Sequence, residues 1–320
     1  MKLTNEQIKS ITFGAIRVCE ENGILHFHKC TQKQIDVWTS HKEILGERAA
    51  TSSGIRLDFH TNSQNFAFRS FQGNKFEIYV DGLLREQVFF KAEGDEREIK
   101  IPLRHPLGNK QDSYRVTVYF PSHEDGVIEW VELDDSATVT PHEYDRKWLF
   151  IGDSITQGWA AIIDSLSYAL RVSRFFNADC VVQGIGGAYF AEDSFDHVDF
   201  DPEIVSVAYG TNDFGHYQTL DELRDHARAH LALIAEEYKG KKLFYISPLW
   251  RGKRDKPMGT FEECREVLIT EAEALGFTHI DGLSLVPPLP NFFYDEYLHP
   301  DNNGFSIYAE NLIAQIKDLI

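Results

Sequence analysis

The sequence has few cysteines, little positive charge and no long apolar run, and each shortage excludes a class of protein. No uninterrupted apolar segment is long enough to span a bilayer, and residues 1–6 lack the apolar core of a signal peptide. The 32 basic residues are outnumbered by 50 acidic ones, which gives a formal net charge of −18. Nucleic acids and anionic membranes attract concentrated positive charge, so we expect neither as a partner.

The four cysteines are scattered along the chain and form no CxxC pair. Without an export signal, we expect a cytoplasmic protein whose thiols are reduced. A disulfide between Cys19 and Cys30 is the alternative if the chain is exported by another route. The sequence does not indicate an oligomeric state.

The front part of the chain predicts β-structure after one short helix over residues 4–10. The 320 residues and a hydrophobic content of 42% are enough for two ordinary cores. Short alternating segments predict strands between residues 11 and 133, and the pairs Asn-Gly at 22–23 and Asp-Gly at 81–82 are typical of hairpin turns. We therefore expect an antiparallel β-sandwich of the jelly-roll type over residues 1–140.

From about residue 141 the pattern changes to strands that alternate with helices. The strands are expected at residues 148–151, 180–183, 204–209, 242–246 and 278–280, and the helices at residues 162–176, 220–237, 260–275 and 304–320. Such alternation predicts an α/β domain over residues 141–320, with a parallel sheet covered by helices on both faces.

The segments that follow the predicted parallel strands carry groups suited to acyl transfer. In such sheets, ligands bind at the carboxyl ends of the strands. Ser154 follows the first strand, and on its own it fits a nucleophile and a helix cap equally well. His299 suits a general base, and a carboxylate before it, Glu296 or Asp295, can orient its ring.

Acyl transfer also requires hydrogen-bond donors for the oxyanion. A glycine allows close approach to its backbone N–H, which makes Gly184, after the second strand, a candidate. Asn212, after the third strand, offers a side-chain amide donor, although an Asn-Asp pair is also typical of a turn. The sequence therefore places a nucleophile, a base and two donors at one edge of the predicted sheet.

These segments resemble the four signature blocks of the SGNH/GDSL hydrolase superfamily. The blocks are Gly152-Asp153-Ser154, Gly184, Asn212 within Gly210-Thr211-Asn212-Asp213, and His299 within Glu296-Tyr297-Leu298-His299-Pro300. They occur in the family's order from about residue 146 onward. A β-rich front half before such a domain is similar to two-domain carbohydrate esterases, which carry a jelly-roll module there.

The resemblance implies a flavodoxin-like α/β/α domain that hydrolyses esters without a metal or another cofactor. It implies that Ser154 is the nucleophile and His299 the base. The oxyanion hole would consist of the backbone N–H groups of Ser154 and Gly184 and the side chain of Asn212. The family usually has aspartate three residues before the histidine. Here Glu296 stands at that position, so we expect Glu296 as the third catalytic residue, with Asp295 as the alternative.

Two further groups of residues have more than one interpretation. His226 and His230 are one helical turn apart, a spacing found in metal sites, but no third ligand is evident and a solvated helix face is favoured. Arg251, Lys253, Arg254 and Lys256 form a basic loop after the fourth strand. A solvated loop is favoured there, and a segment that contacts substrate is the alternative.

We expect a serine esterase that removes a small acyl group, of the acetyl type, from a carbohydrate or another small molecule. The same residues would serve an acyltransferase, a thioesterase or a lysophospholipase. An alternative of another class is a carbohydrate-binding protein whose hydrolase half is inactive.

Overall fold

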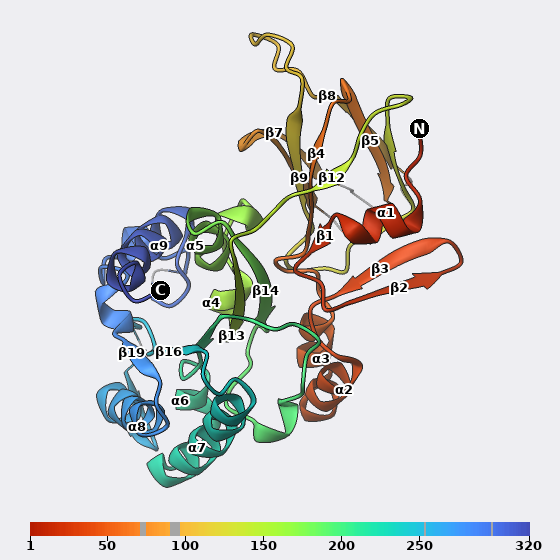
Figure 1. The fold of residues 1–320 in the computed structure, drawn as a ribbon. Coiled ribbons are helices and arrows are strands. Elements are labelled where there is room, and N and C mark those ends of the chain that lie inside the picture. The colour runs from red at the N-terminus through yellow and green to blue at the C-terminus, as the bar shows by residue number, and fades with distance from the viewer. Residues whose placement is uncertain (71–74, 90–96, 253, 296) are drawn as a thin grey trace. The chain divides into compact units, whose positions relative to one another are not determined.

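The computed structural model describes residues 1–70, 75–89, 97–252, 254–295 and 297–320 (Figure 1). The chain divides into two compact units. The first contains Met1–Lys29 and Ala50–Tyr144, and the second contains Cys30–Ala49 and Asp145–Ile320. A short segment from the front part of the chain therefore belongs to the unit formed by the C-terminal half.

The first unit consists of antiparallel sheets and one short helix, α1 (Asn5–Ser10). One sheet has the order β1-β4-β9-β6-β7, with β12 also paired with β4, and two smaller sheets have the orders β10-β3-β2 and β11-β5-β8. The strands are β1 (Thr12–Phe13), β2 (Arg17–Glu21), β3 (Ile24–His28), β4 (Arg56–Thr61), β5 (Asn65–Ser70), β6 (Lys75–Val80), β7 (Leu83–Phe89), β8 (Arg97–Pro102), β9 (Tyr114–Tyr119), β10 (Val127–Ile128), β11 (Trp130–Leu133) and β12 (Thr140–Pro141).

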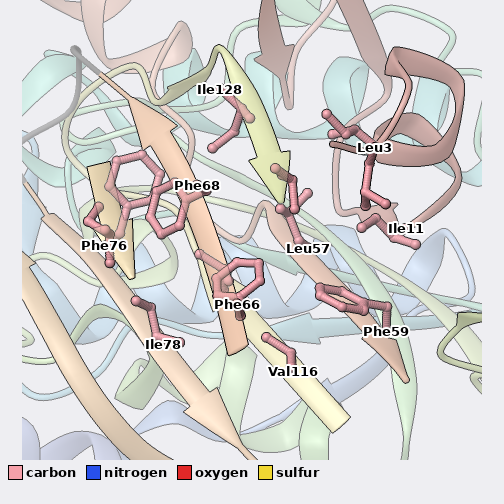
Figure 2. Packing of buried hydrophobic residues seen from close by; sticks show 14 of the residues in the cluster. Leu3, Ile11, Leu57, Phe59, Phe66, Phe68, Phe76, Ile78, Val116 and Ile128 are labelled. Atoms are coloured by element: carbon pink, nitrogen blue, oxygen red, sulfur yellow. The ribbon is translucent and has the colours of Figure 1, made fainter. Parts of the chain in front are cut away.

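Aromatic and aliphatic side chains from different sheets form the core of the first unit (Figure 2). Phe68 on β5 packs edge-on against Phe76 on β6, with ring centroids 5.3 Å apart. Phe66 on β5 lies 5.9 Å from Phe59 on β4. All four side chains are fully buried. Two sheets therefore share one apolar interior, as the alternation of apolar and polar residues along these strands predicts.

Two hairpins of this unit follow directly from their turn residues. Asn22 and Gly23, between β2 and β3, have φ angles of 53° and 83°. Asp81 and Gly82, between β6 and β7, have φ angles of 51° and 78°. Positive φ at both central residues is typical of the type I′ turn, whose twist matches that of the flanking strands.

The second unit begins with two helices in a region where the sequence predicted only strands. They are α2 (Gln32–His41) and α3 (Glu43–Ala49), which pack against each other. Thr31 and Gln34 form a capping box, in which each side chain accepts a hydrogen bond from the other residue's backbone N–H. The Trp38 side chain of α2 is only 1% exposed and packs edge-on against Tyr189.

The five parallel strands expected in the C-terminal half all form, in the sheet order β14-β13-β15-β16-β19. They are β13 (Arg146–Gly152), β14 (Ala178–Gly184), β15 (Ile204–Ala208), β16 (Lys242–Ile246) and β19 (Thr278–Ile280). In order of appearance along the chain this is 2-1-3-4-5, a doubly wound order whose switch point lies between β13 and β15. A ligand is therefore expected where these two strands end.

Two pairs of helices accompany the sheet. α5 (Tyr168–Phe175) packs beside α9 (Asn302–Ile316), and α7 (Leu220–Glu237) packs beside α8 (Phe261–Ala274) (Figure 1). The shorter elements are α4 (Ser154–Gln157), α6 (Asp213–His216), η1 (Asp164–Leu166), η2 (Glu192–Ser194), η3 (Gly282–Ser284), η4 (Pro290–Phe292), β17 (Asp255–Lys256) and β18 (Gly259–Thr260).

Two earlier expectations concern a disulfide bond and membrane-spanning segments. All four cysteines are free thiols, so the alternative disulfide between Cys19 and Cys30 is not formed. Among the helices that the structure describes, none combines the length and the apolar character needed to cross a membrane.

Candidate active site

Ser154 lies at the sharp turn between the central strand β13 and the helix α4. The strand is buried from Trp148 to Gly152, and Ser154 is the first residue of the helix. Asp153 caps this helix, because its side chain accepts a hydrogen bond from the N–H of Ile155 at 2.9 Å. The cap is therefore Asp153 and not Ser154, whose hydroxyl is left for another partner.

Two glycines at the ends of neighbouring strands allow α4 to lie directly against the sheet. Gly152 of β13 is paired with Gly184 of β14. A Cβ atom on Gly184 would lie 2.2 Å from the backbone nitrogen of Gln157, and one on Gly152 would lie 2.1 Å from the Oγ1 atom of Thr156. Both distances are too short for any side chain. Gly184 therefore holds the helix that carries Ser154 close to the sheet.

The side chains of Ser154 and His299 meet, although they are far apart in the sequence. The Oγ atom of Ser154 lies 2.9 Å from the Nε2 atom of His299. Ser154 is 7% exposed and His299 is partly buried. This distance is within the hydrogen-bond range that proton transfer from a nucleophile to a base requires.

The other nitrogen of the His299 ring contacts Asp295. The Nδ1 atom lies 2.7 Å from the Oδ2 atom of Asp295. The Oδ1 atom of the same carboxylate accepts hydrogen bonds from the backbone N–H groups of Tyr297, Leu298 and His299. The loop before His299 is thus folded around Asp295. Glu296, expected as the third catalytic residue, lies outside the described residues.

The same hydrogen bonds keep Asp295 ionised. Burial alone would raise the pKa of its carboxyl group, but the hydrogen bonds from the backbone and ring of His299 and from Leu298 outweigh burial and lower the pKa below its ordinary value. An ionised carboxylate beside Nδ1 holds the proton on that nitrogen. Nε2 is then free to accept the proton of Ser154.

Asn212 lies at the end of the loop after β15, directly before α6, and its side chain bonds to the loop after β14. Its Nδ2 atom donates a hydrogen bond to the carbonyl oxygen of Ala188 at 2.9 Å. This uses one of the two amide protons and leaves the second for another acceptor. Asn212 and Gly187 line the same pocket. Asn212 is therefore a donor at the edge of an open pocket, as an oxyanion site requires.

Two glycines are candidates for the backbone donor, Gly184 at the end of β14 and Gly187 in the loop that follows. Gly184, the residue expected from the sequence, is buried against α4. Gly187 lies on the pocket with Asn212, and its φ angle of +89° suits glycine. No acceptor for the Gly187 N–H lies within hydrogen-bond distance in the described part of the chain. The sequence analysis did not identify Gly187 as a candidate donor.

The pocket beside these donors has a volume of about 410 Å³. Leu298, the residue before His299, contributes to its wall together with Gly187 and Asn212. Other wall residues come from α2 and α3 or directly follow them, including His41, Lys42 and Arg48. A segment that the sequence assigned to the front domain thus forms one side of the pocket within the second unit.

Two carboxyl groups near Ser154 are fully buried, and their pKa values are raised, whereas that of Asp295 is lowered. Burial raises the pKa of the Asp153 carboxyl to about 7, although the hydrogen bond from Ile155 opposes the effect. Burial also raises the pKa of Asp213 to about 7, against the hydrogen bond from the N–H of Phe190. The negative charge of Asp213 also raises the pKa of Asp153, because like charges repel. Both are held by backbone N–H groups and support the loops on either side of the switch point.

The two other groups of residues singled out in the sequence are the pair His226 and His230 and the basic loop after the fourth parallel strand. His226 bonds to Glu192 at 2.8 Å, whereas His230 is buried and bonds to the carbonyl oxygen of Ala191. The two rings thus have different partners. In the basic loop, Arg251 is buried and lines the pocket, Arg254 forms an ion pair with Glu262, and Lys253 lies outside the described residues.

Comparison with known proteins adds a family and a set of similar folds. Residues 150–307 match the model of the GDSL-like Lipase/Acylhydrolase family. No curated protein sequence matches the chain. A salicylyl-acyltransferase from a tetracycline biosynthetic pathway shares 20% identity and a TM-score of 0.81, over 96% of this chain and 94% of that one.

Two other solved structures have the same fold. A GDSL-like lipase from Bacteroides ovatus shares 14% identity and a TM-score of 0.76, over 100% of this chain and 97% of that one. A family two carbohydrate esterase from Clostridium thermocellum, solved in complex with cellohexaose, shares 18% identity and a TM-score of 0.62, over 84% of this chain and 93% of that one. At these identities the likeness concerns the fold.

Proposed function

Through residues 150–307 this chain belongs to the GDSL-like lipase/acylhydrolase family of enzymes that act on ester bonds, and we propose that Ser154, His299 and Asp295 form its catalytic triad. The observation that carries the proposal is the continuous chain of hydrogen bonds from the Ser154 hydroxyl through the His299 ring to the Asp295 carboxylate. This is the arrangement that activates a serine for attack on a carbonyl carbon.

In the proposed reaction, the Ser154 Oγ atom attacks the ester carbonyl while Nε2 of His299 accepts its proton. Asp295 stabilises the resulting imidazolium, and His299 then gives the proton to the departing alcohol. The acyl group remains on Ser154 until a water molecule, deprotonated by the same ring, attacks the acyl-enzyme. Water then takes up the acyl group, and Ser154 regains its proton from His299.

The negative charge that develops on the carbonyl oxygen requires fixed donors. We assign this role to the backbone N–H of Ser154, the side chain of Asn212 and a backbone N–H of the loop after β14. The first N–H groups of a helix have no acceptor within the helix, which suits Ser154. In that loop, the open position of Gly187 on the pocket favours it over Gly184.

The proposed substrate is an ester of a small acyl group, of the acetyl type, with a carbohydrate or another small alcohol. Similar folds that are carbohydrate esterases support this choice, among them an acetyl xylan esterase from Butyrivibrio proteoclasticus with a TM-score of 0.59. The antiparallel front unit, with an apolar core between its sheets, supports the β-sandwich of the jelly-roll type that accompanies such esterases.

Acyl transfer to an acceptor other than water is the second candidate function. The salicylyl-acyltransferase similarity, which spans nearly both chains, favours it. Both reactions share the acyl-enzyme and differ only in what attacks it. Adding candidate alcohols to the assay distinguishes them, because a transferase yields a new ester at the expense of the free acid.

The proposal is tested with 4-nitrophenyl acetate and its longer-chain homologues. We expect Ser154→Ala to lower kcat by about 10⁴-fold or more, since loss of a nucleophile removes the covalent route. Ser40→Ala, at an exposed serine of α2, is the matched control and is expected to keep the parent's activity. A parent and a Ser154→Ala protein of equal activity would exclude the serine mechanism.

A further inference from the structure

The pocket beside the proposed oxyanion site is unusually basic for so acidic a protein. Lys42, Arg48 and Arg251 line it, together with the rings of His41 and His216, and no aspartate or glutamate is among the residues that line it in the described part of the chain. The whole chain has a net charge of −18. We propose that this pocket binds an anionic group, a carboxylate or a phosphate, on the ester substrate. This inference rests on the proposed function.

Arg251 is the strongest support, because it is a buried cation that forms no ion pair with any described residue, although its charge also opposes the rise in the pKa of the buried Asp153. Arg251 is 8% exposed, and among the described residues its only hydrogen bond runs from Nη1 to the carbonyl oxygen of Thr211 at 2.7 Å. The buried Nε atom has no hydrogen-bond partner in the described part of the chain. A buried charge in this state is costly, and a bound anion would supply the missing acceptor.

The surroundings of Arg251 hold its guanidinium in place. It lies 5.2 Å from the ring centroid of Phe214 and 5.7 Å from that of Phe261. Aromatic faces stabilise the cation without neutralising it. No carboxylate of the described residues forms an ion pair with it. A fixed guanidinium with unused donors is the group that proteins commonly use for planar or tetrahedral anions.

Further positive charges come from two other parts of the second unit. Lys42 directly follows α2, is exposed, and forms no ion pair with any described residue. Arg48 on α3 donates to the carbonyl oxygen of Gly186 at 2.7 Å, which fixes its guanidinium beside the loop of Gly187. The Nζ atom of Lys256 lies 3.9 Å from the position that a Cβ of Gly215 would occupy, and Gly215 also lines the pocket.

The acidic side chain that contacts His41 on this wall is already engaged. Asp193 lies 2.8 Å from the Nε2 atom of His41, whose Nδ1 atom contacts the hydroxyl of Tyr189. Tyr189 in turn stacks on His216, with ring centroids 3.6 Å apart. These contacts build a rigid wall of rings beside the cations. The wall suits a compact, planar or cyclic ligand better than a flexible acyl chain.

The pocket is close enough to the reacting groups for both to bind one molecule. Asn212 and Gly187, the proposed oxyanion donors, and Leu298, next to His299, belong to its wall. An anion held there therefore sits on the same ester whose carbonyl faces Ser154. The charge can belong to the acyl half or to the alcohol half, and for a carbohydrate the latter means a sugar acid or a sugar phosphate.

The test compares charged and neutral esters of matched shape. For the alcohol half, 4-acetoxybenzoate and 4-acetoxyphenyl phosphate are compared with neutral 4-acetoxybenzamide. For the acyl half, mono(4-nitrophenyl) adipate is compared with its methyl ester. We expect the kcat/KM of the anionic member of at least one set to exceed that of the neutral member by about tenfold, since hydrogen bonds to a charged group are stronger than neutral ones. The set with the preference identifies the half that carries the charge.

Substitutions of pocket residues then test whether the preference for anionic esters arises in the pocket. Lys42→Gln is expected to lower the ratio of anionic to neutral kcat/KM about threefold, and Arg251→Gln about tenfold. Lys33→Gln removes the same charge from α2, where Lys33 pairs with Asp196, and is expected to keep the ratio. Arg251→Lys retains the charge but loses the fork of guanidinium donors, so it should also lower the ratio, and it replaces Arg251→Gln if that variant fails to fold.

Equal rates for charged and neutral esters in the parent would overturn the inference, as would a preference that neither Lys42→Gln nor Arg251→Lys changes. Calorimetry on the Ser154→Ala protein with 4-hydroxybenzoate, 4-hydroxyphenyl phosphate and adipate separates this outcome from failure of the proposed function. If no ester is hydrolysed but one of these anions binds and Lys42→Gln weakens it, the proposed function fails and the anion site stands. If none binds, the anion site fails whatever the esterase activity.

Discussion

At the scale of single residues, the carboxylate that we propose as the partner of His299 is Asp295, a direct neighbour of Glu296 in the sequence. Glu296 and Asp295 are adjacent, and the family pattern favours the position of Glu296. The structure puts the Asp295 carboxylate 2.7 Å from the His299 ring and surrounds its other oxygen with three backbone N–H groups. Such a turn forms around a short side chain, because Asp bonds readily to backbone groups two to four residues ahead.

We predict that Asp295→Asn lowers kcat by about 10³-fold to 10⁴-fold, because an amide no longer stabilises the imidazolium or its tautomer. Glu296→Gln is the matched control and is expected to change kcat by less than about threefold. Steady-state kinetics on 4-nitrophenyl acetate measure both. A larger loss in Glu296→Gln than in Asp295→Asn would return the role to Glu296.

The residue scale also separates what the sequence could predict about the site from what it could not. The family's signature blocks predict that Ser154 and His299 act together, and the two side chains lie 2.9 Å apart in the structure. The sequence does not distinguish Gly184 from Gly187 as the donor, because the difference lies in their contacts. A Cβ on Gly184, the last residue of β14, would meet the backbone of Gln157 in α4, whereas Gly187 lies on the pocket.

At the scale of elements, the position of the four-residue helix α4 depends on the glycines at the ends of two neighbouring strands. Gly152 and Gly184 leave no side chain between the sheet and the helix. The backbone of Gln157 would meet any Cβ on Gly184 at 2.2 Å, so the helix must move if one is added. Ser154 belongs to that helix, and its distance to His299 therefore depends on residue 184.

Gly184→Ala is expected to lower kcat about a hundredfold or more, because a displacement of about 1 Å at a reacting group costs that much. The overpacked contact should also lower the free energy of unfolding by about 1–3 kcal/mol. Kinetics and urea denaturation measure the two effects. Gly108→Ala, in a loop of the first unit where the nearest atom to a Cβ is 3.2 Å away, is the control. Full activity in Gly184→Ala would show that α4 does not need this close contact.

The elements that the sequence did not predict, α2 and α3, had a local signal. Thr31 and Gln34 have the same spacing as Thr4 and Gln7, which predicted α1, and both pairs form capping boxes. This capping signal was overlooked because the segments before and after it predict strands. Periodicity identified the long elements well, such as α7, whose observed bounds coincide with those expected. A helical insertion of about 20 residues is less evident, because its apolar face contacts residues far along the chain.

At the scale of the whole molecule, the division into units does not follow the chain. Cys30–Ala49 belongs with the C-terminal unit, to which Trp38 and Arg48 are joined through Tyr189 and Gly186. A boundary read from the sequence must be continuous, so it assigned this segment to the front domain. The composition of 20 residues cannot reveal which core they complete, because that depends on contacts with residues more than a hundred positions away.

This division predicts that residues 141–320 alone form an incomplete unit. The comparison is with a fragment in which residues 30–49 are joined to residue 145 by a flexible linker. The shorter fragment should unfold at a temperature lower by roughly 10 °C, given the usual shift of a few degrees per kcal/mol for a domain of this size.

In the full chain, Trp38→Ala should lower the free energy of unfolding by about 3–5 kcal/mol, because Trp38 is fully buried. Lys33→Gln, on the exposed side of the same helix, should change it by less than about 0.5 kcal/mol. Calorimetry and denaturant titration measure these differences. Equal unfolding temperatures of the two fragments would mean that α2 and α3, with the buried Trp38, do not stabilise the hydrolase unit.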